Sequence, residues 1–252
     1  MPTLYAVVPL YNESATLHEC LARVVAVALP SRWTLRILVV DDGSDEATRA
    51  ALMNAKARLH NAVTTMRHER NRGKGAAVAT GFGHVAGVST DTEDAVIIQD
   101  ADLEYDPADF LGLIHALEAI GPRGAAFGNR WHRGAVRAGL KGRLHMGINR
   151  LLTKWSNARC GIRLSDMECC YKAMRVGVMR EVLPLLSERG FGIEPELVAA
   201  LARLRVPFRE VPVSYSPRTR AEGKKIGPLD GIRALWVTFR GVSPRSDPRD
   251  PQ

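Results

Sequence analysis

The amino-acid sequence predicts an α/β fold in which helices flank a mostly parallel sheet. Three observations predict it: short apolar runs rich in β-branched residues recur in the first half, segments with helical spacing alternate with them, and polar residues follow where the runs end. The chain has 252 residues, of which 46% are hydrophobic, so it can bury a sizeable core. In such a sheet, the loops that leave the carboxyl ends of the strands form the ligand-binding edge.

Each predicted strand of the first half is an apolar run bounded by turn-forming residues. These runs lie at residues 5–10, 35–40, 62–66, 95–98 and 125–127. Between them, apolar residues three and four positions apart predict helices at residues 17–28 and 110–117.

The second half of the chain is less regular, and we expect a strand, two helices, another strand and an amphipathic helix. They lie at residues 169–174, 178–186, 196–204, 206–215 and 229–239. Residues 242–252 are rich in Pro, Arg and Asp, and we expect them to form a disordered tail.

The net charge is +8, with 35 Lys and Arg against 27 Asp and Glu. This balance suits anionic partners, such as nucleotide diphosphates, lipid phosphates or nucleic acid. Aromatic residues make up only 6% and form no ladder with basic ones, which argues against nucleic acid. The basic tract from Arg130 to Arg163 is either a phosphate-facing surface or an ordinary solvated face.

The cysteines and the N-terminus indicate a reduced, cytoplasmic protein. Cys20, Cys160, Cys169 and Cys170 have no CxxC spacing, so neither a zinc site nor a redox motif is indicated. The first residues lack a secretory signal, and no run of about 18 apolar residues suggests a membrane span. Membrane contact would therefore be peripheral.

The segment VIIQDADLEYDP, residues 96–107, places two carboxylates directly after an apolar strand. Alternate side chains of an extended chain point the same way, so Asp100 and Asp102 can face one ligand. Such oxygen donors suit Mg²⁺ or Mn²⁺ bound to a diphosphate, and Glu104 offers a third oxygen. Alternatively these acids cap a helix, as Asp106 before Pro107 is expected to do.

Two further loops are polar at the same edge. In LVVDDGSDEAT, Asp42 is placed to bind a base or a ribose. The same residues are also typical of a turn followed by the start of a helix. NRGKG, residues 71–75, supplies two glycines and two cations at a helix start, which fits nucleotide or phosphate. It matches neither a P-loop nor a dinucleotide fingerprint, which argues against kinases and dehydrogenases.

Read in order, four segments together resemble one enzyme family. They are PLYNE at 9–13, VDDGSD at 40–45, NRGKG at 71–75 and DADLEYDP at 100–107. This ordered set resembles family-2 glycosyltransferases, and more narrowly the polyprenyl-phosphate glycosyltransferases of the dolichol-phosphate mannose synthase type. The resemblance continues through GNR, SDMECCYKAM, GFGIEPE and YSPRTRAEGKKI and covers nearly the whole chain except the tail.

The resemblance implies a GT-A fold over residues 1–241, with a nucleotide-sugar-binding half at 1–130 and an acceptor-side half at 131–241. It implies a hexosyltransferase that moves mannose or glucose from GDP-mannose or UDP-glucose, with Mg²⁺ or Mn²⁺ and with inversion at the anomeric carbon. The acceptor would be a polyprenyl phosphate, dolichyl or undecaprenyl, reached by peripheral contact with anionic lipid at the inner face of the membrane.

Matched residue by residue, the resemblance also implies a site. The nucleotide sugar would lie among Pro9, Tyr11, Glu13, Asp42, Lys74 and Asp100, and the metal on Asp100, Asp102 and Glu104. Asp102, Arg130 and Asp166 are the residues expected in catalysis. Glu104 departs from the synthase pattern, where this position is commonly Gln, so metal preference or affinity is expected to differ.

A polyprenyl phosphate is an anionic nucleophile near neutral pH, so its attack on the sugar would require no strong base. Catalysis would then be electrostatic, with cations neutralising the leaving diphosphate and positioning the incoming phosphate. The acceptor-phosphate candidates are Arg130, Lys141, Arg143, Arg218 and Lys224. The last two belong to a basic loop at 215–226 that either closes over the phosphates or rests on anionic lipid.

Two other functions stay open from the sequence. A sugar-hydroxyl acceptor would need a carboxylate base, with Asp166, Glu194 or Glu196 as sources, of which Asp166 is the one we retain. An inactive nucleotide-sugar-binding scaffold would use the same pocket without turnover. The intact acids at 100 and 102 argue against that scaffold.

Overall fold

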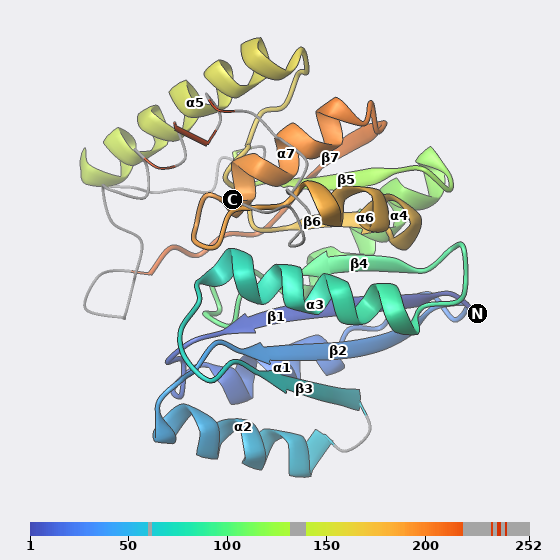
Figure 1. The fold of residues 1–252 in the computed structure, drawn as a ribbon, viewed down its shortest axis with the longest axis vertical. Coiled ribbons are helices and arrows are strands. Elements are labelled where there is room, and N and C mark those ends of the chain that lie inside the picture. Colours follow the sequence, from blue (N-terminus) through green and yellow to red (C-terminus); the bar gives the residue numbers. More distant parts are fainter. Residues whose placement is uncertain (60–61, 132–139, 219–232, 234–235, 238–239, 241–252) are drawn as a thin grey trace, which may run out of the picture.

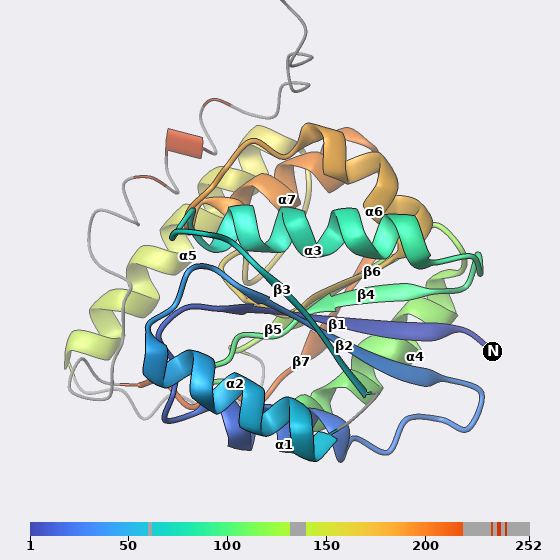
Figure 2. The same ribbon diagram turned by 60° about the horizontal axis from the view of Figure 1, so that its bottom comes forward.

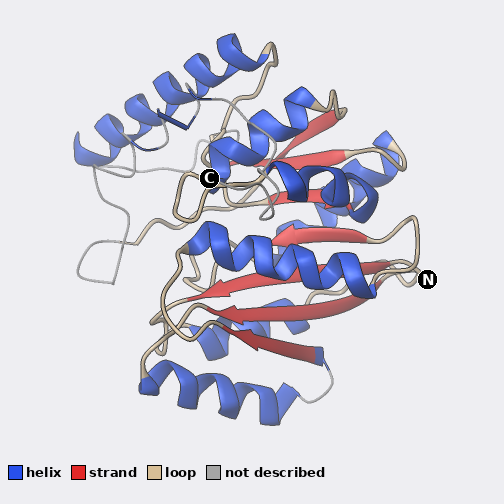
Figure 3. Cartoon of the chain, in the orientation of Figure 1, coloured by secondary structure: helices blue, strands red, loops and turns tan. Residues whose placement is uncertain are grey.

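The fold was derived from a computed structural model, which describes residues 1–59, 62–131, 140–218, 233, 236, 237 and 240. Side chains of residues 140–145 are outside the description. Among the described residues, seven strands form one sheet in the order β3-β2-β1-β4-β6-β5-β7 (Figures 1 and 3). Strand β6 is antiparallel to its neighbours β4 and β5, while the other pairs are parallel. The predicted α/β class with a mostly parallel sheet is confirmed.

The strands follow the apolar runs closely. Their bounds are β1 (Thr3–Leu10), β2 (Thr34–Asp41), β3 (Val63–Arg67), β4 (Ala95–Ile98), β5 (Ala125–Asn129), β6 (Lys172–Arg175) and β7 (Phe208–Pro212). All four residues of β4 are buried, because helices cover both faces of the sheet.

Figure 2 shows the layers: α3, α6 and α7 cover one face, and α1, α2 and α4 cover the other. The helices are α1 (Leu17–Val25), α2 (Glu46–Leu59), α3 (Lys74–Val88), α4 (Phe110–Ile120), α5 (Leu140–Cys160), α6 (Val176–Val182) and α7 (Ile193–Arg203). Short 3₁₀ turns η2 (Pro107–Asp109) and η3 (Leu183–Leu185) extend this set. The predicted cap is confirmed, since the Asp106 carboxylate accepts a hydrogen bond from the Ala108 N–H at 3.0 Å.

Several predicted bounds in the second half need correction. The helix expected at 178–186 begins at Val176 and gives way at residue 183 to η3, where Pro184 cannot donate the next helical hydrogen bond. The helix expected from 196 begins at Ile193, because Pro195 is tolerated in a first turn. The strand expected at 206–215 ends at Pro212, and the tail and most of 229–239 lie outside the described residues.

The predictions did not include a helix within the basic tract, yet α5 covers 21 residues there. Several of its polar side chains face inward: Thr153 accepts from the Met167 N–H, and Asn157 bonds to both backbone groups of Leu164. Ile148, Leu151 and Trp155 are instead 47%, 68% and 45% exposed. On the described part of α5 the buried face mixes Leu152, which is 8% exposed, with polar residues such as Asn149 and Ser156, so the usual inward apolar stripe is interrupted and its periodicity does not predict the helix.

Candidate active site

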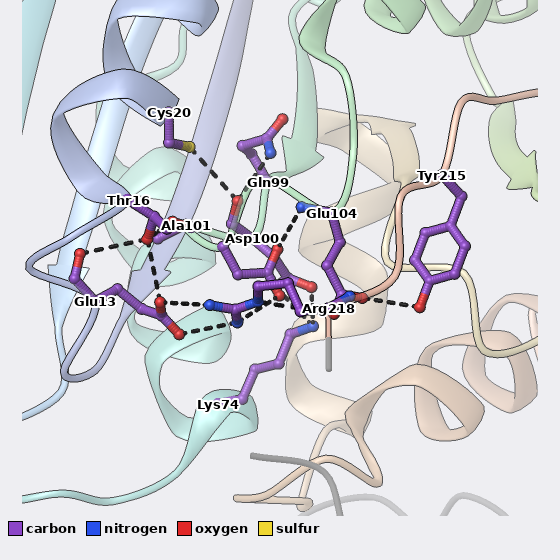
Figure 4. A network of polar contacts seen from close by, with 11 residues as sticks. Glu13, Thr16, Cys20, Lys74, Gln99, Asp100, Ala101, Glu104, Tyr215 and Arg218 are labelled. Carbon is purple, nitrogen blue, oxygen red and sulfur yellow. Dashed lines mark hydrogen bonds and ion pairs between the residues drawn. The ribbon is translucent and has the colours of Figure 1, made fainter. Parts of the chain in front are cut away.

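The acidic turn after β4 is held in a fixed shape by hydrogen bonds from neighbouring elements. The Gln99 N–H donates to the Val7 carbonyl at 2.9 Å, and the Thr16 hydroxyl donates to the Ala101 carbonyl at 2.8 Å. Within the turn, the Glu104 N–H donates to Asp102 Oδ1 at 3.1 Å. Figure 4 shows Asp100 and Glu104 beside Glu13 of the β1–α1 loop, at the carboxyl edge of the sheet.

Arg218 places a guanidinium among three of these acids. It lies 2.9 Å from Glu13 Oε2 and 3.1 Å from Asp102 Oδ2, with the Glu104 carboxylate 3.8 Å from its Nε. Glu104 also accepts from the Tyr215 hydroxyl at 2.8 Å and from the Arg218 N–H at 3.0 Å. The segment 215–218 is thereby fastened to the acidic turn, although more than a hundred residues separate the two.

Lys74 occupies the other side of the turn. Its Nζ lies 2.8 and 3.0 Å from the two Asp100 oxygens and 3.0 Å from Glu194 Oε1. Glu194 in turn pairs with the buried Lys172 at 2.6 Å. Asp100, Lys74, Glu194 and Lys172 therefore form a row of alternating charge that runs from β4 to β6.

These ion pairs form two sets. Asp100 and Glu194 with Lys74 and Lys172 carry no net charge, whereas Glu13, Asp102 and Glu104 pair with Arg218, so this second set carries two excess negative charges when all are ionised. Burial, followed by the carboxylates of Asp100 and Glu104, raises the pKa of Asp102 from its ordinary 3.8 to about 7. The site accordingly favours binding of a cation or a proton.

The three predicted metal ligands do not form a ready-made cage. Over the residues that the structure describes, no three His, Cys, Asp or Glu side chains converge in a way that would hold a metal. Asp100 turns to Lys74, while both oxygens of Glu104 face Tyr215 and Arg218. The excess charge nevertheless fits a divalent cation, and oxygen donors are the ligands that Mg²⁺ and Mn²⁺ prefer.

Asp42, the predicted nucleotide contact, is 2% exposed and organises the loop that leads into α3. Its Oδ1 lies 2.6 Å from His68 Nδ1 and accepts from the Arg72 N–H, and its Oδ2 accepts from the Gly73 N–H at 2.7 Å. His68 was not predicted, because a single His in a polar segment carries no spacing signal. The contact of Asp42 with a nucleotide stays a prediction.

The role expected for the glycines of NRGKG is corrected. The N–H groups of Gly75 and Ala76 donate to the carbonyls of Gly190 and Arg189, at 3.2 and 3.0 Å, so they do not face a phosphate. A Cβ at Gly73 would lie 2.3 Å from the Arg189 carbonyl oxygen, and φ there is +97°. The glycines therefore permit close backbone packing of 73–76 against 189–190, and Lys74 is the remaining phosphate candidate in this segment.

Arg130 and Asp166 form a buried pair. Arg130 Nε and one terminal nitrogen donate to the two Asp166 oxygens at 2.7 Å each, and the Arg130 N–H adds a third bond at 3.0 Å. The guanidinium also stacks between Trp131 and Tyr215, at 4.9 and 5.0 Å from their ring centroids. The structure thus gives both residues, expected in catalysis, a structural partnership beside the Tyr215–Arg218 segment.

The other predicted residues are divided between described and undescribed regions. Pro9 lies near the end of β1, and Tyr11 follows it with 37% exposure. Lys141 and Arg143 lie in α5, but their side chains are outside the described set, as is Lys224. Lys172 and Tyr215 join the site without having been predicted, because their partners lie far away in sequence.

Glu168 offers a pH-dependent test close to this network. Burial, together with Glu194, outweighs the attraction of Lys172 and raises the pKa of Glu168 from its ordinary 4.5 to about 7. Between these values the unfolded chain has lost the proton that the folded protein keeps, so stability should fall as the pH rises through this window and level off above about 7. Glu168→Gln removes this titration, since the amide has no acidic proton to lose.

We expect wild-type protein to lose about 3 kcal/mol of unfolding free energy, relative to Glu168→Gln, between about pH 4.5 and 8. Urea denaturation of both proteins across this range measures the difference. Parallel pH profiles would contradict the raised pKa.

The solved structures that resemble this chain share its GT-A fold. The glucosyl-3-phosphoglycerate synthase of Mycobacterium tuberculosis, crystallised with Mn²⁺, uridine diphosphate and glucosyl-3-phosphoglycerate, superposes with a TM-score of 0.65 at 17% identity. The match covers 94% of this chain and 78% of that one. The same enzyme with Mg²⁺ and uridine diphosphate gives a TM-score of 0.62.

Residues 5–183 match Glycosyl transferase family 2, and the chain belongs to that family. Similar curated proteins are the undecaprenyl-phosphate 4-deoxy-4-formamido-L-arabinose transferases of Edwardsiella ictaluri, 29% identical over 222 residues, and of Shewanella sediminis, 30% identical over 219. Each match covers 86% of this chain. The chain spans about three fifths of the length of these relatives, 61% and 60%. The predicted resemblance to this family is confirmed.

Proposed function

We propose that this protein transfers a sugar from a nucleotide-diphosphate donor to a polyprenyl phosphate, with inversion at the anomeric carbon. The observation that carries the proposal is the acidic cluster around Asp100 and Asp102, with its two excess negative charges, at the edge of a family-2 sheet. The relatives named for undecaprenyl phosphate favour that class of acceptor. Mannose and glucose are the proposed sugars, and the relatives' names add 4-deoxy-4-formamido-L-arabinose.

We propose Mg²⁺ or Mn²⁺ as the cofactor, held by Asp102 and Asp100 with Glu104 as a further oxygen donor. When bound, such a cation neutralises the charge that develops on the departing nucleoside diphosphate. The chain's own residues have the complementary tasks. Lys74 supplies a second positive charge beside Asp100, and Glu13, Tyr11 and Pro9 flank the nucleotide.

The choice between a phosphate and a hydroxyl acceptor depends on whether a candidate carboxylate is available to act as a base. Both oxygens of Asp166 accept from Arg130, and those of Glu196 accept from Ser187 and the Glu188 N–H. Glu194 lies between two lysines. A hydroxyl acceptor needs a carboxylate that can reach its proton, whereas a phosphate acceptor needs none, so these contacts support the phosphate.

We further propose that α5 rests on the membrane surface near the acceptor lipid. Ile148, Leu151 and Trp155 recur on one face at helical spacing, and Arg150 and Lys154 are exposed beside them. Apolar side chains with flanking cations suit the interface of an anionic bilayer. The described residues contain no helix long and apolar enough to cross a membrane.

The double variant Leu151→Ser/Trp155→Ser should bind vesicles that contain phosphatidylglycerol at least about tenfold more weakly, because each lost side chain removes buried apolar area. Vesicle flotation measures the partition. Met53→Ser is the matched control, since Met53 is 72% exposed on α2, away from this face. Equal binding of all three proteins would exclude α5 as the contact.

A donor screen tests the function itself. The protein is incubated with GDP-mannose, UDP-glucose and nucleotide-activated 4-deoxy-4-formamido-L-arabinose, with Mn²⁺ or Mg²⁺ and a short polyprenyl phosphate. A lipid-linked sugar labile to mild acid is expected. Transfer only to a soluble sugar would overturn the phosphate acceptor, and binding of donors without any turnover would indicate the inactive scaffold.

A further inference from the structure

Glu194 is placed where it controls the position of Lys74. It lies in the first turn of α7, is 5% exposed, and bridges two ammonium groups, Lys74 through Oε1 at 3.0 Å and Lys172 through Oε2 at 2.6 Å. Lys172 is 1% exposed and donates in addition to the carbonyls of Met167 and Cys169. The Glu194 carboxylate is therefore anchored on one side and presents its second oxygen to Lys74.

The contact with Glu194 limits the positions that the Lys74 ammonium can occupy. The four-carbon stem of Lys74 is flexible and its ammonium is a compact charge with no preferred direction, so one partner leaves it many positions. Asp100 alone would draw Nζ fully onto the acidic turn. Glu194 pulls the ammonium toward α7, and Lys74 is held between the two at 12% side-chain exposure.

We infer that Glu194 is a positioning residue for Lys74: it holds the ammonium beside Asp100 in the orientation that receives the donor diphosphate. The inference rests on the proposed function, because it takes Lys74 to face that diphosphate. It also gives Glu194 a role other than that of a base, which was one of the roles open from the sequence. Lys172 in turn holds the Glu194 carboxylate in place.

Glu194→Gln tests the inference, because the amide keeps the size of the side chain and removes its charge. We expect nucleoside diphosphate to bind about tenfold or more weakly, because the lysine loses one of the two carboxylates that hold its ammonium; a tenfold change corresponds to about 1.4 kcal/mol. Titration calorimetry with uridine or guanosine diphosphate and Mn²⁺ measures this affinity without sugar or lipid. In a Lys74→Met background, Glu194→Gln should change the affinity less than twofold, because its effect passes through Lys74.

Glu196→Gln is the matched control. Glu196 lies two residues further along the same helix, is 1% exposed, and binds Ser187 and Glu188 rather than a lysine of the site. Its loss should lower the melting temperature, and whatever effect it has on affinity should be the same with and without Lys74. This additivity is what a merely structural role produces.

The possible results distinguish a failure of the proposed function from a failure of the positioning role of Glu194. If wild-type protein binds no nucleoside diphosphate, the proposed function fails. If it binds, but Glu194→Gln weakens binding equally with and without Lys74, the positioning role is refuted. Should Glu194→Gln not fold, Glu194→Gln combined with Lys172→Gln replaces it, because that pair leaves no unpaired buried charge, and the same comparison applies.

Discussion

Asp102→Ala is expected to lower the rate of sugar transfer by at least about a thousandfold. The carboxylate lies at the centre of the acidic cluster, and its removal takes away one of the two negative charges that a divalent cation would balance. Loss of metal-assisted charge stabilisation is worth several kcal/mol, and each 1.36 kcal/mol is a factor of ten in rate. Steady-state turnover with Mn²⁺ and a polyprenyl phosphate measures the loss.

Asp106→Ala is the control for Asp102. It removes another carboxylate four residues away, which caps η2, so it should cost about 1 kcal/mol of stability and leave turnover within a few fold of wild type. If Asp102→Ala retained wild-type turnover, the assignment of the metal to this turn would be wrong.

The same residue sets an expected pH dependence. The carboxyl of Asp102, with its pKa raised to about 7, must lose a proton before it binds a cation. The affinity for Mn²⁺, followed by electron paramagnetic resonance, should therefore fall about tenfold per pH unit below 7 and be constant above it. Asp102→Asn should weaken binding and remove this slope.

Arg130→Ala is expected to lower the free energy of unfolding by about 3–5 kcal/mol. The substitution leaves the Asp166 carboxylate, which is 1% exposed, without its two side-chain donors, and an uncompensated buried charge is strongly destabilising. The stacking of the guanidinium on Trp131 and Tyr215 is lost as well. Urea denaturation measures the change.

Two further variants identify the cause. Arg123→Ala breaks an exposed pair with Glu181 and should leave the free energy of unfolding nearly unchanged, because solvent screens such a pair. Arg130→Ala combined with Asp166→Leu should recover much of the lost stability, because no buried charge remains. If the double variant were as unstable as Arg130→Ala, the unpaired charge would not be the cause.

The sequence predicts which segments form the strands of the sheet, but not the direction of every strand. Apolar runs identify β1, β2, β4 and β5 because central strands are largely buried on both faces and their composition shows it, and the edge strand β3 by its shorter run. The run at 169–174 gives no sign that β6 is antiparallel, since alternation and burial are the same in either direction. Helix α5 was missed for the opposite reason, because its described inward face mixes Leu152 with polar residues.

The candidate site was predictable where ligands share a loop and not where they come together through the fold. Asp100 and Asp102 were found because two residues of spacing place them at one edge. The bond from Arg218 to Asp102 spans 116 residues, and the one from Lys172 to Glu194 depends on where β6 begins. Neither relationship is visible in local spacing. The glycines of NRGKG were expected at a phosphate but serve close backbone packing, because both require the same residue type.

The place of β6 between β4 and β5 also has a consequence for how the protein is made. A ribosome delivers Glu13, Asp100, Asp102 and Glu104 before Lys172 and Arg218, so the first half emerges with Lys74 for Asp100 but without the Arg218 that pairs with the other three acids. Until β6 arrives, β4 is an open strand edge, the kind of surface that promotes misassociation. Pairings over such long sequence separations form slowly. We therefore expect a truncated first half to aggregate, and chaperone binding during synthesis to be concentrated before residue 172 is released.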